Sequence, residues 1–82
     1  MTEVVLYGKA GCHLCDDART VVDRVLADFP DVAFEERSIL DDEALSAAYA
    51  EEIPVVLVDG RVHTIWRVND DRLRKALAGT SA

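Results

Sequence analysis

Apolar and polar residues recur with different periods along the chain, and each change of period marks a new element. The short apolar run at residues 4–7 indicates a buried strand. From Cys12 to Phe29, apolar side chains recur at steps of three and four residues, which predicts an amphipathic helix. Pro30 and Asp31 end this helical pattern. The first third of the chain is therefore predicted to form a strand, a turn and a helix.

A second strand and a short helix are predicted in the middle of the chain. Residues 32–39 have the strand pattern, with Val32 and Phe34 on one face. The acidic pair at residues 41–42 is typical of a helix start. The apolar stripe expected on this helix comprises Leu45, Ala48 and Tyr49.

A hairpin is predicted next. The continuous apolar run at residues 55–58 indicates a strand that is buried on both faces. The Asp-Gly pair at residues 59–60 is a strong signal for a hairpin turn, so residues 61–66 should return as an antiparallel strand.

A last helix completes the chain. The Asn-Asp-Asp sequence at residues 69–71 should cap this helix, with Leu73 and Leu77 facing inward, and residues 79–82 should fray. The resulting order β-α-β-α-β-β-α predicts an α/β fold, a four-stranded mixed sheet flanked by helices. With only 82 residues, half of them hydrophobic, residues 1–82 are expected to form one domain.

The net charge of the chain argues against some classes of binding partner. Sixteen acidic residues against nine basic ones give a net charge of −7, which argues against binding to nucleic acid or to anionic membranes. The start of the chain lacks the pattern of a signal peptide, and no apolar run approaches the length of a membrane span. We therefore expect a cytoplasmic monomer that binds neither nucleic acid nor membrane.

Both cysteines of the chain lie at the predicted start of the first helix. Cys12 follows a turn that ends at Gly11, and a helix start offers unpaired N–H groups and a positive dipole end to a thiolate. Lys9 adds a nearby positive charge. Cys12 is the candidate nucleophile, and Cys15, one turn further along, is the candidate resolving thiol.

Each of two residues near the cysteines has two possible roles. His13, between the cysteines, either favours the Cys12 thiolate or is a solvated residue at the helix start. Tyr7 ends the strand that leads into the turn, so its ring is either core packing or a support whose hydroxyl reaches the thiol pocket.

Two sequence segments together resemble the glutaredoxin branch of the thioredoxin superfamily. They are LYGKAGCHLCDDA and EEIPVVLVDG, and they are most similar to short glutaredoxin-like proteins with a C-x-L-C motif. The resemblance implies a thioredoxin-like fold and thiol–disulfide exchange with a disulfide-containing protein or a small thiol. It also implies that the bond between Ile53 and Pro54 is cis, and that Ile53, Pro54 and Val55 form a wall that contacts substrate beside the cysteines.

The resemblance leaves the identity of the electron donor open. Lys9 and the segment at residues 53–55 match features with which glutaredoxins hold glutathione. The Gly-Gly turn before the last helix is replaced, because residues 67–71 read Arg-Val-Asn-Asp-Asp. Asp70 and Asp71 should repel an incoming carboxylate, which Arg67 could offset. Glutathione, another low-molecular-weight thiol and a thioredoxin-type reductase all stay open as electron donors, with no bound cofactor expected.

Two other functions compete with thiol–disulfide exchange. Cys12, His13, Cys15 and His63 are four candidate metal ligands, although structural zinc sites commonly use two spaced pairs. An iron–sulfur cluster shared between two chains is the related possibility; our prediction is that no metal is bound. The third alternative is a non-catalytic binding protein with a thioredoxin-like fold, since fold alone does not fix function.

Overall fold

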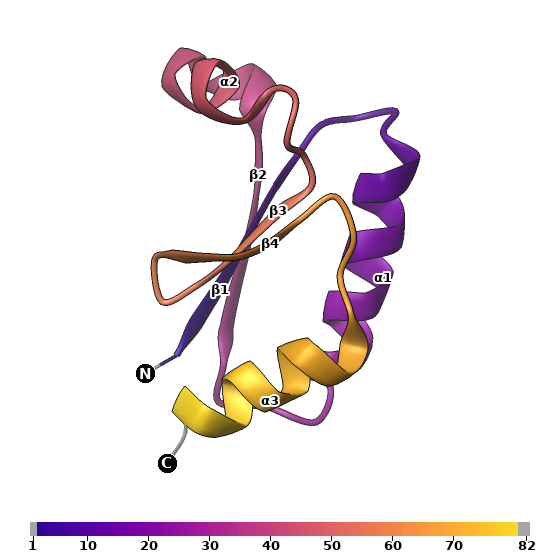
Figure 1. The fold of residues 1–82 in the computed structure, drawn as a ribbon, viewed down its shortest axis with the longest axis vertical. Coiled ribbons are helices and arrows are strands. Elements are labelled where there is room, and N and C mark those ends of the chain that lie inside the picture. Colours follow the sequence, from indigo (N-terminus) through magenta and orange to yellow (C-terminus); the bar gives the residue numbers. More distant parts are fainter. Residues whose placement is uncertain (1, 81–82) are drawn as a thin grey trace.

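The computed structural model describes residues 2–80, which form one four-stranded sheet with helices around it (Figure 1). The elements in chain order are β1 (Glu3–Gly8), α1 (His13–Leu26), β2 (Ala33–Ser38), the short 3₁₀ helix η1 (Ile39–Asp41), α2 (Glu43–Tyr49), β3 (Val55–Val58), β4 (Arg61–Ile65) and α3 (Asp70–Thr80). The strand order is β2-β1-β3-β4. β1 is parallel to β2 and antiparallel to β3, and β4 is antiparallel to β3. The predicted α/β fold with a mixed sheet is confirmed.

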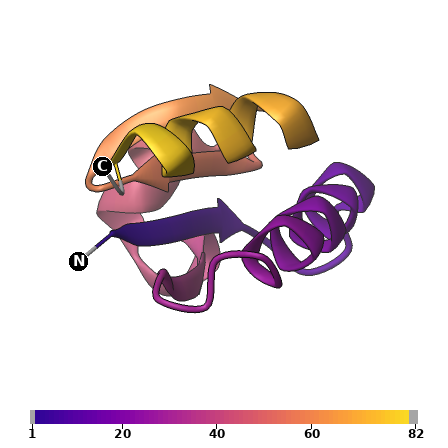
Figure 2. The ribbon, with the colours of Figure 1, turned by 90° about the horizontal axis from the view of Figure 1, so that it is seen from below.

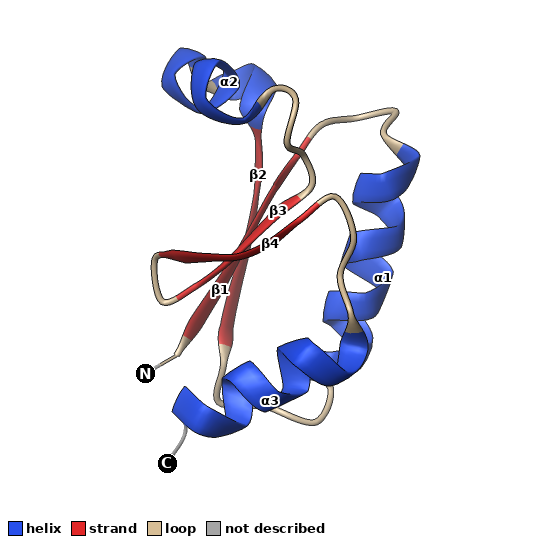
Figure 3. Cartoon of the chain, in the orientation of Figure 1, coloured by secondary structure: helices blue, strands red, loops and turns tan. Residues whose placement is uncertain are grey.

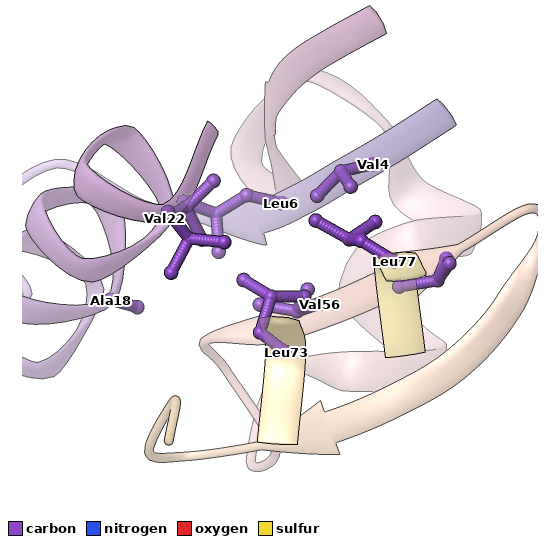
Figure 4. Close-up of a cluster of buried hydrophobic side chains, with 9 residues drawn as sticks. Val4, Leu6, Ala18, Val22, Val56, Leu73 and Leu77 are labelled. Carbon is purple, nitrogen blue, oxygen red and sulfur yellow. The ribbon is translucent and has the colours of Figure 1, made fainter. Parts of the chain in front are cut away.

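Helices α1 and α3 cover one face of the sheet and enclose the main core (Figure 1). Side chains of a strand alternate between the two faces of the sheet. On the central strands β1 and β3, the side chains that face α1 and α3 are apolar. Figure 4 shows the resulting cluster, in which side chains from β1, β3, α1 and α3 point toward one another. Its buried members are Val4, Leu6, Ala18, Val22, Val25, Val56, Val58, Leu73 and Leu77.

The opposite face of the sheet has a smaller apolar cluster. Val5, Val55 and Leu57 are buried there, and the aromatic rings of Tyr7 and Tyr49 pack against them. Helix α2 has only seven residues, and none of them is fully buried. It contacts the rest of the protein through Leu45 and Tyr49, whereas Ala48 is exposed. The prediction that Ala48 belongs to an inward stripe was therefore wrong.

Several boundaries differ from the sequence prediction. Helix α1 ends at Leu26, not at Phe29, because residues 28 and 29 donate their N–H groups to carbonyls three residues back and Phe29 precedes a proline. Strand β2 ends at Ser38, whose side chain accepts a hydrogen bond from the N–H of Leu40 and begins η1.

The predicted turn and the predicted last cap are both present. Asp59 and Gly60 have φ angles of 51° and 82°, as a tight hairpin turn requires. The side chain of Asn69 accepts a hydrogen bond from the N–H of Arg72, at 3.0 Å, which caps α3. Helix α3 includes Gly79 and reaches Thr80, so the fraying predicted for residues 79–82 stays a prediction; residues 81–82 lie outside the described residues.

Three loops meet at one end of the sheet. They are the β1–α1, α2–β3 and β4–α3 loops, drawn in tan in Figure 3. The start of β1 and the end of α3 lie at the opposite end of the molecule in both Figure 1 and Figure 2. Among the residues described, no helix is long and apolar enough to cross a membrane.

Candidate functional site

The two cysteines occupy the start of α1 in the way that the sequence predicts. Gly11, with φ at 80°, turns the chain so that Cys12 becomes the residue that caps the helix. The Cys12 sulfur accepts a hydrogen bond from the backbone N–H of Cys15 at 3.2 Å. Cys12 is partly exposed and Cys15 is buried, and both are free thiols. Cys12 is therefore the more accessible of the two cysteines.

Cys15 is protected from ionisation by its surroundings. Burial is the main cause that raises the pKa of Cys15 to about 11, and its hydrogen bond with Cys12 acts in the same direction. A hydrogen bond from the backbone of Lys9 opposes both effects. At neutral pH the Cys15 side chain is a neutral thiol that can donate a proton toward Cys12.

The end of β1 fits closely against Cys15. A Cβ atom placed on Gly8 would lie 3.0 Å from the Cys15 sulfur and 3.2 Å from its Cβ. Gly8 is buried, and the absence of a side chain leaves room for the thiol. Sequence reasoning assigned Gly8 only to a turn, because the contact depends on how α1 packs on β1.

A Gly8→Ala substitution should lower the free energy of unfolding by about 1–3 kcal/mol, because the added methyl group overpacks the Cys15 site. Urea denaturation measures this loss. Gly79→Ala is the matched control, since its added Cβ would meet nothing within 4 Å. The cost of Gly8→Ala should shrink when Cys15→Ala is also present. Equal stability of the two single alanine variants would contradict the assigned contact.

The segment before β3 lies against the cysteine pair. The Ile53–Pro54 peptide bond is cis. Ile53 is buried in one apolar cluster with Cys15 and Ile39, against which Cys12 packs. Pro54 and Val55 are buried beside it. The structure thus brings Ile53 together with both cysteines, whereas Val55 packs in the separate cluster of Val5 and Leu57.

Tyr7 packs between two apolar clusters. Its ring lies 5.3 Å from the ring of Tyr49, centroid to centroid. It also packs against the cluster of Cys15 and Ile53. These contacts fit core packing, the first of the two roles that the sequence left open for Tyr7.

The charged and polar residues near the cysteine motif are exposed at the surface. Lys9 is exposed and lines a cavity of about 230 Å³ together with Arg19 and Arg37. His13 is exposed at the first position of α1. The Asp16 carboxylate accepts a hydrogen bond from Arg19 at 3.0 Å, so its negative charge is paired.

His63 is not brought to the cysteines. It lies on β4, and among residues 2–80 no group of three or more His, Cys, Asp or Glu side chains is arranged to hold a metal ion. Its Nε2 atom is buried without a hydrogen-bond partner. Burial lowers the pKa of His63 from its usual 6.5, and the nearby charge of Arg72 adds to this effect.

This environment predicts a loss of stability in mild acid. The unfolded state takes up a proton near pH 6.5, whereas the folded state does so only at a lower pH. The free energy of unfolding should therefore fall as the pH drops below about 6.5, until it passes the lowered pKa. Urea titrations between pH 7.5 and 5.5 measure the slope, and His63→Gln should flatten it. An equal slope in that variant would assign the effect to other groups.

The chain matches a known protein family over most of its length. The family described as a glutaredoxin-like domain (DUF836) matches residues 3–78. The chain belongs to this glutaredoxin-like family. Uncharacterized proteins of Mycobacterium tuberculosis and Mycobacterium bovis are 32% identical over 83 residues, covering 93% of this chain and 82% of each relative.

Solved structures agree with this assignment. An X-ray structure of the structural-genomics target protein XcR50 from X. campestris has a TM-score of 0.76 and 35% identity, over 93% of this chain and 96% of that one. Fasciola hepatica thioredoxin has a TM-score of 0.70 and 20% identity, over 95% of this chain and 79% of that one. The glutaredoxin-like chain therefore has the thioredoxin fold, and its close cysteine pair is consistent with redox function.

The glutaredoxin-like protein departs from the sequence prediction at Trp66. We expected Trp66 to end strand β4 within the sheet, but β4 ends at Ile65. Trp66 has a φ angle of 67°, and its side chain is 52% exposed. Sequence patterns did not reveal this, because an aromatic residue rarely takes a left-handed backbone conformation.

Proposed function

We propose that this glutaredoxin-like protein is a thiol–disulfide oxidoreductase that uses Cys12 and Cys15. The observation that carries the proposal is the asymmetry of the pair. The sulfur of the partly exposed Cys12 lies at a helix start and accepts a hydrogen bond from a backbone N–H, whereas the buried Cys15 thiol stays protonated beside it. Such an arrangement favours Cys12 as the nucleophile of a first exchange and Cys15 as the attacking thiol of a second exchange.

The proposed reaction takes place in two exchanges. The Cys12 thiolate attacks one sulfur of a substrate disulfide, forms a mixed disulfide, and the other substrate sulfur leaves as a thiolate that takes up a proton. Cys15 then loses its proton and attacks the Cys12 sulfur. The Cys12–Cys15 disulfide forms, the mixed disulfide breaks, and the second substrate sulfur leaves as a thiol. The protein loses two electrons, and the substrate gains them with two protons.

The surrounding residues have supporting roles in this proposal. The backbone of Ile53, Pro54 and Val55 forms the wall along which the substrate lies, since their side chains are buried, and Lys9 contributes positive charge near Cys12. The two protein sulfurs carry the electrons, so no bound cofactor takes part. A low-molecular-weight thiol such as glutathione, or a thioredoxin-type reductase, returns two electrons to the Cys12–Cys15 disulfide.

Redox titration tests the proposal. The protein is equilibrated in thiol buffers of defined potential, and free thiols are then alkylated and counted by mass spectrometry. We expect a reversible two-electron transition between about −270 and −120 mV, the range of known dithiol couples. A pair that never oxidises reversibly, or that is purified with a bound metal, would contradict the proposal.

A further inference from the structure

Arg19 joins the first turns of α1 to the neighbouring strand β2 through two carboxylates. Its Nε atom donates to Oε1 of Glu36 at 2.8 Å, and its Nη2 atom donates to Oε2 of the same carboxylate. Its Nη1 atom donates to Oδ1 of Asp16 at 3.0 Å. A two-point contact between a guanidinium group and a carboxylate fixes the orientation of both. Glu36 therefore anchors the side chain that pairs with Asp16.

Asp16 lies one helical turn from the proposed nucleophile. Its backbone N–H donates to the carbonyl of Cys12 at 3.1 Å, the hydrogen bond of residues four apart in an α-helix. Residues at this spacing lie on one face of a helix, and helical side chains tilt toward the helix start. The Asp16 carboxylate is therefore directed toward the turn that begins at Cys12.

A negative charge in this position opposes the chemistry of Cys12. Thiol–disulfide exchange requires a thiolate, and a nearby carboxylate disfavours that charged form. Burial is the main cause of the raised pKa of Cys15, and the charge of Asp16 makes a smaller contribution in the same direction. The field of Asp16 thus reaches the cysteine pair, and a cation paired with Asp16 offsets it.

Arg19 is also placed next to the loop that leads to the cysteines. It lines the cavity of about 230 Å³ together with Gly8, Lys9 and Ala10 of that loop. The Arg19 side chain is 39% exposed, and ion pairs with this exposure usually add little to stability. The position of Arg19 therefore favours an effect on the charges around the cysteines rather than on the stability of the fold.

We propose that Arg19 is a positioning residue for the reaction of Cys12: held by Glu36, it pairs with the Asp16 carboxylate and keeps that charge from opposing the Cys12 thiolate. This inference rests on the proposed function and deepens it, because it assigns a residue outside the cysteine motif that keeps the nucleophile reactive. Arg19 acts through Asp16, and the reacting sulfurs stay those of Cys12 and Cys15.

Alkylation by iodoacetamide, an uncharged reagent, measures the reactivity of Cys12 without a disulfide substrate. Tandem mass spectrometry distinguishes its adduct from that of Cys15. In Arg19→Ala, the Cys12 rate at neutral pH should fall about 3-fold, the effect of a unit charge roughly 6 Å away in water. Arg19→Lys should restore part of the rate, because it keeps the charge without the two-point contact. The matched control is Arg24→Ala, since Arg24 is an exposed arginine in the last turn of the same helix. A parental rate in Arg19→Ala would overturn the inference.

Three further measurements separate an effect of charge from an effect of structure. Asp16→Asn, added to Arg19→Ala, should restore the rate, since the carboxylate one turn from the nucleophile is then absent. The deficit of Arg19→Ala should shrink at about 1 M salt, which screens charges strongly. It should also vanish above about pH 10, where cysteine is mostly thiolate in every variant. Lys9, His13 and Cys15, the other titratable groups of the motif and its loop, are the same in all variants. A deficit that none of the three conditions reduces would make Arg19 a structural residue and refute the proposed role.

Disulfide reduction distinguishes failure of this inference from failure of the proposed function. With hydroxyethyl disulfide as the substrate, Arg19→Ala should lower kcat/KM by a factor similar to its loss of alkylation rate. If the parent protein reduces no disulfide while the alkylation pattern holds, the proposed function is refuted and the role of Arg19 stands. If the parent reduces disulfides and Arg19→Ala is alkylated as fast as the parent, only the role of Arg19 is refuted.

Discussion

A Cys15→Ser variant should accumulate as a mixed disulfide in which the substrate is joined to Cys12. Cys12 is the more accessible of the two cysteines, and the attack that would release the substrate comes from the buried Cys15 thiol. After incubation with a disulfide substrate, mass spectrometry under non-reducing conditions should show the added mass of one substrate half. A reducing agent should remove that mass.

The matched variant is Cys12→Ser, which should lower disulfide reduction to the uncatalysed rate. Its remaining thiol, Cys15, is buried, and burial raises the pKa of this thiol, so it stays largely protonated at neutral pH. This variant should trap little substrate. Should Cys12→Ser trap the substrate while Cys15→Ser does not, the roles of the two sulfurs are reversed.

A Leu73→Ala substitution should have the largest effect on stability. Leu73 is fully buried and holds the first turn of α3 against Val56 and Leu6 on the sheet. Loss of such a side chain costs about 2–5 kcal/mol, through lost transfer energy and the cavity left behind. A chain of this length has a total stability of only about 4–12 kcal/mol. The midpoint of urea denaturation should therefore fall sharply.

The control for this prediction is Val62→Ala, since Val62 is half-exposed on β4 and should tolerate the change within about 0.5 kcal/mol. Loss of α3 packing should also weaken the β4–α3 loop beside Trp66. If Leu73→Ala and Val62→Ala had the same denaturation midpoint, the placement of α3 on the sheet would be wrong.

The sequence predicted the elements well where a strong pattern and a local signal agreed. The buried run at residues 55–58, the turn at Asp59 and Gly60, and the cap at Asn69 all depend on neighbouring residues. The helix-start position of Cys12 follows in the same way from the turn at Gly11. Local chemistry is visible in a sequence because the residues responsible are close along the chain.

Features that depend on tertiary contacts were missed. The fit of Gly8 against Cys15 exists only because α1 packs on β1. The exposed, left-handed Trp66 is set by hydrogen bonds to Pro54 and Glu51, which are more than ten residues away. The exposure of Ala48 reflects how little of the sheet α2 covers. None of these contacts produces a periodic pattern of residues from which it could be predicted.

The burial of Cys15 also has a consequence for the order of events during synthesis. Part of its cover comes from Ile39 and Ile53, which leave the ribosome after the cysteine motif itself. Until then, neither Ile39 nor Ile53 shields the second sulfur from solvent or oxidants. The difference in burial between the two thiols is thus complete only when the segments of Ile39 and Ile53 have docked, and a peptide of the motif alone should show two thiols of similar reactivity.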